Sequence, residues 1–183
     1  MGSISVHEFV SLDGVFEDPS WTAPYGFSEG MGRAIGDLTS ASSAILLGRT
    51  TFQMFAPAWS GRTAEDDPGA PFFNDTTKYV VSSTLSSADE WRNSTVFGPY
   101  DADAVRKLKD EVDGGIYISG SGTLVRALLA DGLVDELHLF VYPVVLGAGA
   151  KLFPDGTGHV PLALPAQEAF ENGVLHLTYA PAR

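Results

Sequence analysis

The chain contains no cysteine, and this absence excludes several kinds of chemistry at once. Without a thiol there is no disulfide, no cysteine nucleophile, no iron–sulfur cluster and no cysteine-ligated zinc. Zinc deaminases are excluded as well, because their signature requires a pair of cysteines. The four histidines show no helical ligand spacing, so we expect surface or core roles for them and no metal site. They are His7, His138, His159 and His176.

Basic residues are also scarce. Lysine and arginine number 11 against 23 aspartates and glutamates, which gives a formal net charge of -12. The only dense basic run, residues 106–109, is followed at once by Asp110 and Glu111. Nucleic-acid binding depends on clustered positive charge, so neither nucleic acid nor an anionic membrane is an expected partner. A phosphorylated ligand would have to be held by backbone amides and one or two arginines.

Long apolar runs are missing too. No stretch approaches the roughly 20 residues of a membrane span, and the first residues lack the pattern of a secretory signal. We therefore expect a cytoplasmic protein. A chain of 183 residues buries about 70% of its unfolded surface, which predicts one domain over residues 1–183.

Strand-like and helix-like segments alternate along the first two thirds of the chain, and strands follow. Apolar, β-branched runs predict strands at residues 4–11, 44–47, 78–82, 95–97, 116–118, 136–145, 163–170 and 174–179. Apolar spacing and capping residues predict helices at residues 28–41, 49–55, 101–112 and 123–130. Residues 15–27 and 59–75 are expected to be loops. This order indicates an α/β fold whose mainly parallel sheet has an antiparallel edge.

Three junctions that follow predicted strands combine glycine, hydroxyl groups and an arginine. They are residues 48–51, 82–83 and 119–123. Glycine lets a phosphate approach the backbone, and a helix N-terminus supplies free N–H groups. Because parallel strands end at one edge of a sheet, three such junctions favour a dinucleotide. Taken singly, each junction is equally typical of ordinary turn chemistry.

Standard motifs do not explain these junctions. The Gly120-Ser121-Gly122 segment begins a dinucleotide fingerprint, but Val125 stands where the third glycine or alanine belongs. Ser119 replaces the first glycine of a nucleophile elbow, so a serine hydrolase is not indicated.

Two carboxylates, Asp13 and Glu29, flank the predicted loop, which is rich in glycine, proline and aromatic residues. This loop is expected to fold over the edge of the sheet, where Trp21, Tyr25 and Phe27 would form the wall of a ring pocket. Loop packing explains the same aromatic residues, and a structural role explains the same carboxylates.

The order of the motifs resembles the dihydrofolate-reductase-like superfamily, and within it the family of the reductase domain of bacterial riboflavin biosynthesis. The segments that carry the resemblance are SLDG at 11–14, LLGRTTF at 46–52, KYVVSS at 78–83, GIYISGSG at 115–122, VDEL at 134–137 and PVVLG at 143–147. They span nearly the whole chain in the family's order.

The resemblance implies a three-layer fold, in which helices flank a central eight-stranded, mostly parallel sheet with an antiparallel C-terminal edge. It implies NADPH as the cofactor. Arg49, Ser82 and Ser83 would lie near the adenosine 2′-phosphate and ribose, and residues 13–27 would cover the nicotinamide. The cofactor-binding residues implied in this way are Gly48, Arg49, Thr50, Thr51, Ser82, Ser83, Gly120, Ser121, Gly122 and Thr123.

The expected activity is the NADPH-dependent reduction of a small pteridine-like or ribosylaminopyrimidine-like heterocycle. Asp13 or Glu29, or a water that they hold, would deliver the proton. Trp21, Phe27 and Arg33, the one basic residue of the first helix, are the candidate substrate contacts. Two alternatives remain: a nucleotide-binding regulatory module without turnover, and a purely structural scaffold. A homodimer is expected, in which residues 139–146 and their extension at 143–149 pair with a second subunit, and a central strand explains the same apolar residues.

Overall fold

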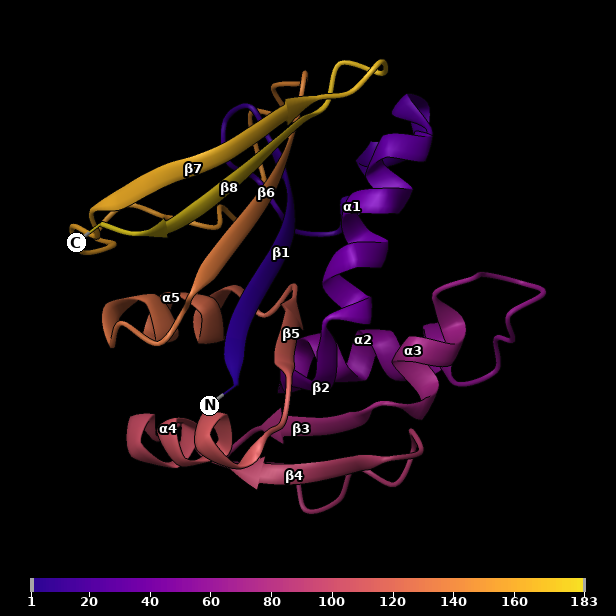
Figure 1. Cartoon of the computed structure of the whole chain (residues 1–183), viewed down its shortest axis with the longest axis vertical. Coiled ribbons are helices and arrows are strands. Elements are labelled where there is room, and N and C mark those ends of the chain that lie inside the picture. The colour runs from indigo at the N-terminus through magenta and orange to yellow at the C-terminus, as the bar shows by residue number, and fades with distance from the viewer. Residues whose placement is uncertain (1, 183) are drawn as a thin grey trace.

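The computed structural model describes residues 2–182, and its centre is one eight-stranded sheet (Figure 1). The strands are β1 (Ser3–Ser11), β2 (Ser42–Gly48), β3 (Thr77–Val81), β4 (Ser94–Gly98), β5 (Gly115–Ser119), β6 (Glu136–Tyr142), β7 (Leu162–Ala169) and β8 (Leu175–Pro181). The helices are the 3-10 helix η1 (Pro19–Tyr25), α1 (Glu29–Ser40), α2 (Arg49–Trp59), α3 (Ala70–Asp75), α4 (Ala102–Glu111) and α5 (Gly122–Ala130).

The strand order is β4-β3-β2-β5-β1-β6-β8-β7. Every pairing from β4 to β6 is parallel, and β8 and β7 add an antiparallel edge. The predicted α/β fold is therefore confirmed. Helices cover both faces of the parallel part, which explains the uninterrupted apolar sequence of β2. Ala44 and Leu46 face one layer of helices, and Ile45 and Leu47 face the other.

The two helical layers bury different faces of the sheet. Helices α4 and α5 pack on one face through Val105, Leu108 and Leu128, whereas α1, α2 and α3 pack on the other. Local capping chemistry begins two of these helices as the sequence predicted. The hydroxyl of Ser28 accepts the N–H of Met31, and the carboxylate of Asp101 accepts the N–H of Ala104.

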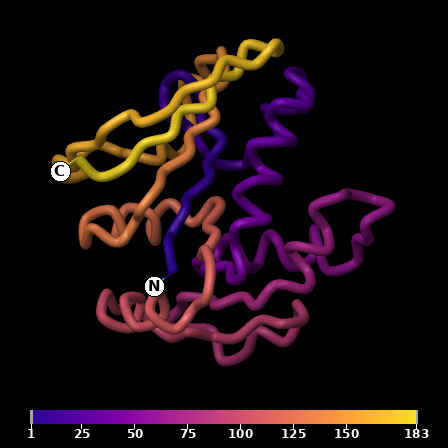
Figure 2. Tube along the Cα trace, in the orientation of Figure 1, coloured from indigo at the N-terminus to yellow at the C-terminus, as the bar shows by residue number. Residues whose placement is uncertain are grey.

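The turn between β7 and β8 reaches the N-terminal end of α1 (Figure 2). The ring of Phe170, at the end of the hairpin, lies directly against Gly30, where a Cβ atom would overlap with it. Gly173 makes the turn with a φ of 84°, a conformation that glycine adopts without strain. The Asn172-Gly173 sequence between the two predicted strands is typical of such a turn.

Three sequence predictions about elements were wrong. Residues 15–27 are not a continuous loop, because the 3-10 helix η1 forms at Pro19–Tyr25. Residues 59–75 are not a continuous loop, because α3 forms within them and α2 runs on through Pro57 to Trp59. The strand predicted at 136–145 ends at Tyr142, and β1, with nine residues, is the longest strand.

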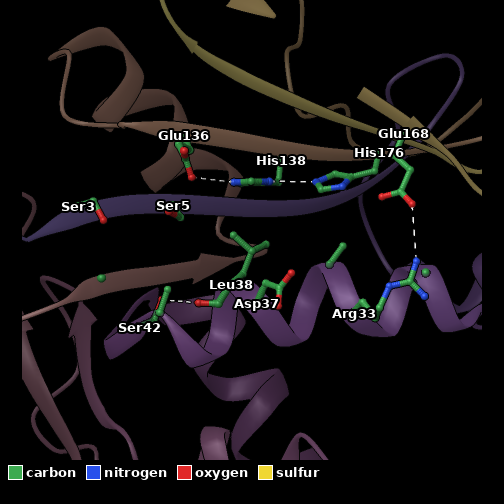
Figure 3. A pocket seen from close by; sticks show the side chains of 14 residues that line it. Ser3, Ser5, Arg33, Asp37, Leu38, Ser42, Glu136, His138, Glu168 and His176 are labelled. Carbon is green, nitrogen blue, oxygen red and sulfur yellow. Dashed lines mark hydrogen bonds and ion pairs between the residues drawn. The ribbon is translucent and has the colours of Figure 1, made fainter. Parts of the chain in front are cut away.

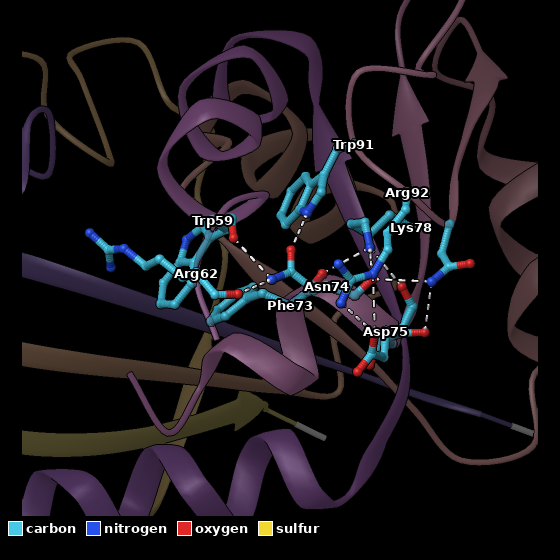
Figure 4. A network of polar contacts seen from close by, with 10 residues as sticks. Trp59, Arg62, Phe73, Asn74, Asp75, Lys78, Trp91 and Arg92 are labelled. Atoms are coloured by element: carbon cyan, nitrogen blue, oxygen red, sulfur yellow. Dashed lines mark hydrogen bonds and ion pairs between the residues drawn. The ribbon is translucent and has the colours of Figure 1, made fainter. Parts of the chain in front are cut away.

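Helix α3 is held by a buried polar network that its own sequence does not reveal (Figure 4). The ammonium of Lys78 on β3 donates to the carbonyls of Phe73, Asn74 and Thr76 at 2.8, 3.3 and 2.8 Å. The Asn74 side chain accepts from the indole of Trp91 and donates to the carbonyls of Trp59 and Arg62. These contacts satisfy the last carbonyls of α3, which no residue within the helix can reach.

The structure also bears on the expected dimer contact. Strand β6 is paired on both sides, with β1 and with β8, so residues 139–142 do not form a free edge. The open edges of the sheet are β4 and β7. Residues 139–142 are therefore part of a central strand, which was the alternative explanation, and cannot pair with a strand of a second subunit. Residues 143–149 lie beyond this pairing, and the homodimer stays a prediction. Among residues 2–182, no helix is both long and apolar enough to cross a membrane.

Candidate active site

The turn after β5 is bound directly to the start of α2. Ser121 has a left-handed backbone, with a φ of 59°, which costs energy for any residue other than glycine. Thr51 supports it, because its Oγ1 accepts both the N–H and the hydroxyl of Ser121 at 2.8 Å. The Ser121 hydroxyl in turn accepts the N–H of Gly48 at 2.9 Å. Hydrogen bonds thus join two of the three predicted junctions, residues 48–51 and residues 119–123.

Two glycines of this turn are required by their surroundings. Gly120 has a φ of 64° and lies close to the Thr51 side chain. A Cβ on Gly122 would overlap with the ring of Phe16, which lies against this glycine. The first turn of α5 therefore offers backbone N–H groups at a helix N-terminus, behind one aromatic ring.

The third junction adds a basic depression of about 320 Å³, lined by Arg49, by residues 81–84 and by Pro99 and Tyr100. The guanidinium of Arg49 donates to the Thr84 hydroxyl at 3.1 Å. The Ser82 hydroxyl accepts the backbone N–H groups of Thr84 and Leu85, which fixes the turn. Ser83 is exposed beside it. One exposed guanidinium among hydroxyl groups suits a phosphate.

A dinucleotide phosphate fits these residues. Glycine positions that leave no room for a side chain, the α5 N-terminus and Arg49 lie along the ends of three neighbouring strands, β3, β2 and β5. Thr50 and Thr123 are exposed in the first turns of α2 and α5. The structure brings together the junctions that the sequence singled out.

The carboxylate of Asp13 holds a neighbouring loop. It accepts the Ser11 hydroxyl at 2.6 Å and the N–H groups of Leu146 and Gly147 at 3.1 and 2.8 Å. These bonds, that of Ser11 first, lower the pKa of Asp13 to about 2. Asp13 is thus ionised at neutral pH, and both of its oxygens are engaged.

Glu29 does not approach Asp13. Its side chain is 90% exposed and pairs with Arg33 one turn further along α1, at 3.7 Å. Arg33 also lies 3.8 Å from Glu168 of β7. Phe27 is 63% exposed, whereas Trp21 packs edge-to-face on Tyr142, as does Tyr25. Of the predicted aromatic residues, Trp21 and Tyr25 close over the sheet and Phe27 does not.

Sequence reasoning missed one buried titratable residue on β1, Glu8, and expected a surface or core role for its neighbour His7. His7 is 4% exposed, and its Nδ1 lies 2.7 Å from the Tyr117 hydroxyl. Burial, with help from His138 and His176, lowers the pKa of His7 to about 3. Glu8 is 3% exposed, and burial raises its pKa well above the usual value. The sequence did contain a signal for Glu8, because it lies among the apolar residues of a predicted buried strand. A glutamate is seldom fully buried without a partner, so one in such a strand often has a specific role.

A second cavity, of about 420 Å³, lies between α1 and the face of the sheet that α1 covers (Figure 3). Its floor carries a hydrogen-bonded chain from Glu136 through His138 to His176, with distances of 3.1 and 2.9 Å. Arg33 lines one end of it. The cavity also reaches Ser3 and Gly115, where β1 and β5 begin, so it lies away from the glycine turn.

The fold is that of dihydrofolate reductases and their relatives. Dihydrofolate reductase from Enterococcus faecalis, solved as a complex with NADP(H), superimposes with a TM-score of 0.65 at 15% identity, covering 100% of this chain and 98% of that one. A protein from Shewanella sp. PV-4 named for riboflavin biosynthesis superimposes with a TM-score of 0.81 at 19% identity, covering 99% of both chains. Identities this low show the shared fold.

The chain belongs to the family of RibD C-terminal domains, whose model matches residues 3–176. It is 28% identical over 175 residues to the uncharacterized protein YyaP of Bacillus subtilis (strain 168), covering 93% of this chain and 90% of YyaP. The deaminase and 5-amino-6-(5-phosphoribosylamino)uracil reductase of Thermotoga maritima shares the fold with a TM-score of 0.68 at 15% identity. There the match covers 99% of this chain and 57% of the larger protein.

Proposed function

We propose that this protein is an NADPH-dependent reductase of a small heterocycle of the pteridine or ribosylaminopyrimidine class. The observation that carries the proposal is the bonding between Thr51, Ser121 and Gly48, which joins two phosphate-suited junctions beside the Arg49 depression. A protein with the same fold has been solved with NADP(H), and another is a reductase of a phosphoribosylaminouracil.

Each junction has a role in this proposal. Arg49, with Ser82 and Ser83, binds the 2′-phosphate and the adenosine ribose, because a guanidinium forms charge-assisted bonds with phosphate. The backbone of residues 120–123 binds the pyrophosphate at the N-terminus of α5. Gly48, Thr50 and Thr51 complete the shell from α2. When bound, the nicotinamide supplies the hydride, and the protein orients it and excludes water.

The aromatic residues at the other side of β1 form the proposed substrate wall. Trp21 and Tyr25 pack on Tyr142, and their flat faces suit a heterocyclic ring. Phe27 and Arg33 lie further out and are candidates for contact with a substituent of the ring. Asp13 acts through a water or through the loop it holds, because a carboxylate with a pKa of about 2 does not donate its own proton at neutral pH.

A second candidate function is nucleotide binding without turnover. One observation favours it: neither proposed proton-delivery residue is a buried acid, since Asp13 is ionised and Glu29 is exposed and paired with Arg33. A screen of pteridines and ribosylaminopyrimidines for NADPH oxidation separates the two. Turnover of one of them supports the reductase, and tight NADPH binding without any turnover supports the binding module.

The first experiment is a titration with NADPH and NADH, followed by quenching of the protein's tryptophan fluorescence. We expect NADPH to bind at least about tenfold more tightly, because only NADPH carries the phosphate that Arg49 would bind. Equal affinities would contradict the assignment of Arg49, and no binding of either nucleotide would contradict the proposed function. A homodimer is also expected, and light scattering at micromolar concentration measures it.

A further inference from the structure

Glu8 is buried beside the glycine turn at residues 120–122, and only one of its two carboxyl oxygens has a hydrogen-bond partner. Its Oε2 accepts the N–H of Gly120 at 3.2 Å. Its Oε1 has no hydrogen-bond partner among residues 2–182, although it is fully enclosed. Within the same residues Glu8 forms no ion pair. A buried polar atom without a partner destabilises a folded protein, so this oxygen needs an explanation.

The hydrogen bonds of Glu8 decide whether its Oε1 acts as a hydrogen-bond donor or as an acceptor. Burial without a cation favours the neutral acid, and the pKa of Glu8 is accordingly raised well above its usual value. Because Oε2 accepts the Gly120 N–H, the proton belongs on Oε1. Glu8 therefore offers one O–H donor that has no acceptor. A neutral acid also does not repel a pyrophosphate at the adjacent turn.

The position of Glu8 along the sheet edge decides which part of a dinucleotide it can meet. Arg49 and residues 82–84 follow β2 and β3, and the glycine turn follows β5. Strand β1 is the next strand beyond β5, on the side away from β2. If the 2′-phosphate lies at Arg49 and the pyrophosphate at the turn, the nicotinamide half extends toward β1.

We infer that Glu8 binds the nicotinamide carboxamide, with its Oε1–H donating to the carboxamide oxygen while Oε2 retains the N–H of Gly120. This inference rests on the proposed function and deepens it. Glu8 would fix the orientation of the nicotinamide ring, and with it the face from which hydride leaves. Because Oε1 is enclosed, the nicotinamide would reach it only once the side chains that cover it move aside. A nucleotide without the carboxamide would leave Oε1 without a partner.

Two ligands and two variants test the assignment. NADPH is compared with 2′-phospho-ADP-ribose, which has the 2′-phosphate and the pyrophosphate but no nicotinamide. Glu8→Leu is expected to lower NADPH affinity about tenfold and to change 2′-phospho-ADP-ribose affinity less than twofold. Glu8→Gln, whose amide both accepts from Gly120 and donates in place of Oε1, is expected to bind NADPH within about threefold of wild type.

Equal loss of both ligands in Glu8→Leu would show that Glu8 only supports the turn, and would overturn this inference while leaving the proposed function intact. Unchanged NADPH affinity would overturn it as well. Failure of the wild-type protein to bind either nucleotide would instead contradict the proposed function itself, and the inference with it.

Infrared difference spectroscopy on the wild-type protein tests the same contact without depending on Glu8→Leu. The C=O stretch of protonated Glu8 is assigned by its absence from Glu8→Gln. We expect NADPH to shift this band and 2′-phospho-ADP-ribose to leave it in place. No shift, or the same shift with both ligands, would overturn the inference.

Discussion

Oγ1 of Thr51 accepts two hydrogen bonds from Ser121, one from its N–H and one from its hydroxyl, both at 2.8 Å. These residues are 70 positions apart in the sequence. Their contact holds Ser121 in its left-handed conformation and joins the start of α2 to the start of α5. The proposed pyrophosphate site depends on this contact.

Thr51→Val keeps the shape of the side chain and removes the acceptor. We expect NADPH affinity to fall about tenfold and the free energy of unfolding to fall by about 1–3 kcal/mol, because the part-buried N–H and hydroxyl of Ser121 lose their acceptor. Fluorescence titration and urea unfolding measure the two effects. Thr51→Ser keeps the hydroxyl and is the matched control. A Thr51→Val protein that binds NADPH as wild type does would remove this contact from the site.

Arg49→Ala is expected to weaken NADPH binding at least about tenfold and to leave NADH binding nearly unchanged. The reason is that only NADPH carries the phosphate beside Arg49. Arg62→Ala, at an exposed arginine in the segment before α3, is the control and should affect neither nucleotide. Equal losses for NADPH and NADH in Arg49→Ala would place the phosphate elsewhere.

Phe16 covers Gly122 at the first turn of α5. Phe16→Ala is therefore expected to speed the association of NADPH several-fold, because the N–H groups of the turn become accessible without displacing a ring. Stopped-flow fluorescence measures the rate. Phe27→Ala removes an exposed ring that lies against Gly32 of α1, away from Gly122, and should leave the rate unchanged. Slower association in Phe16→Ala would mean that the ring helps to hold the nucleotide.

Acid should destabilise the protein through His7. Burial, aided by His138 and His176, lowers the pKa of His7 from 6.5 to about 3, so between these values the unfolded chain binds a proton that the folded chain does not. Stability is then present above pH 6.5 and is lost as the pH falls, by about 2 kcal/mol at pH 5. His7→Gln should lose less stability than wild type between pH 7 and pH 5 in urea unfolding. His159→Gln, at an exposed histidine, should behave as wild type.

Lys78→Met removes the buried ammonium that donates to three carbonyls after and within α3. We expect the free energy of unfolding to fall by about 2–4 kcal/mol, because the carbonyls of Phe73 and Thr76 then lose this buried donor. The carbonyl of Asn74 keeps the side-chain amide of Asn93. Thermal or urea unfolding measures this. Lys107→Met, at an exposed lysine of α4, should change stability little. A small effect of Lys78→Met would show that water replaces the ammonium.

Local chemistry made much of the fold predictable. The β-branched runs, the caps at Ser28 and Asp101 and the turn at Gly173 act through neighbouring residues, so the sequence contains their whole cause. Helix α3 escaped prediction because Lys78 and Trp91, which lie outside it, satisfy its polar groups. The end of β6 was misjudged because apolar residues continue past Tyr142 after strand pairing stops.

The sequence by itself also determined which junctions suit phosphate, since glycine, hydroxyl and arginine chemistry belongs to the residues. Tertiary structure alone decided how those residues are used. It bonded Thr51 to Ser121, closed Phe16 over Gly122 and enclosed Glu8 with one oxygen bonded and the other unpaired. The physical reason is that burial and bonding between distant strands set the protonation and exposure of a side chain, and no short stretch of sequence encodes either.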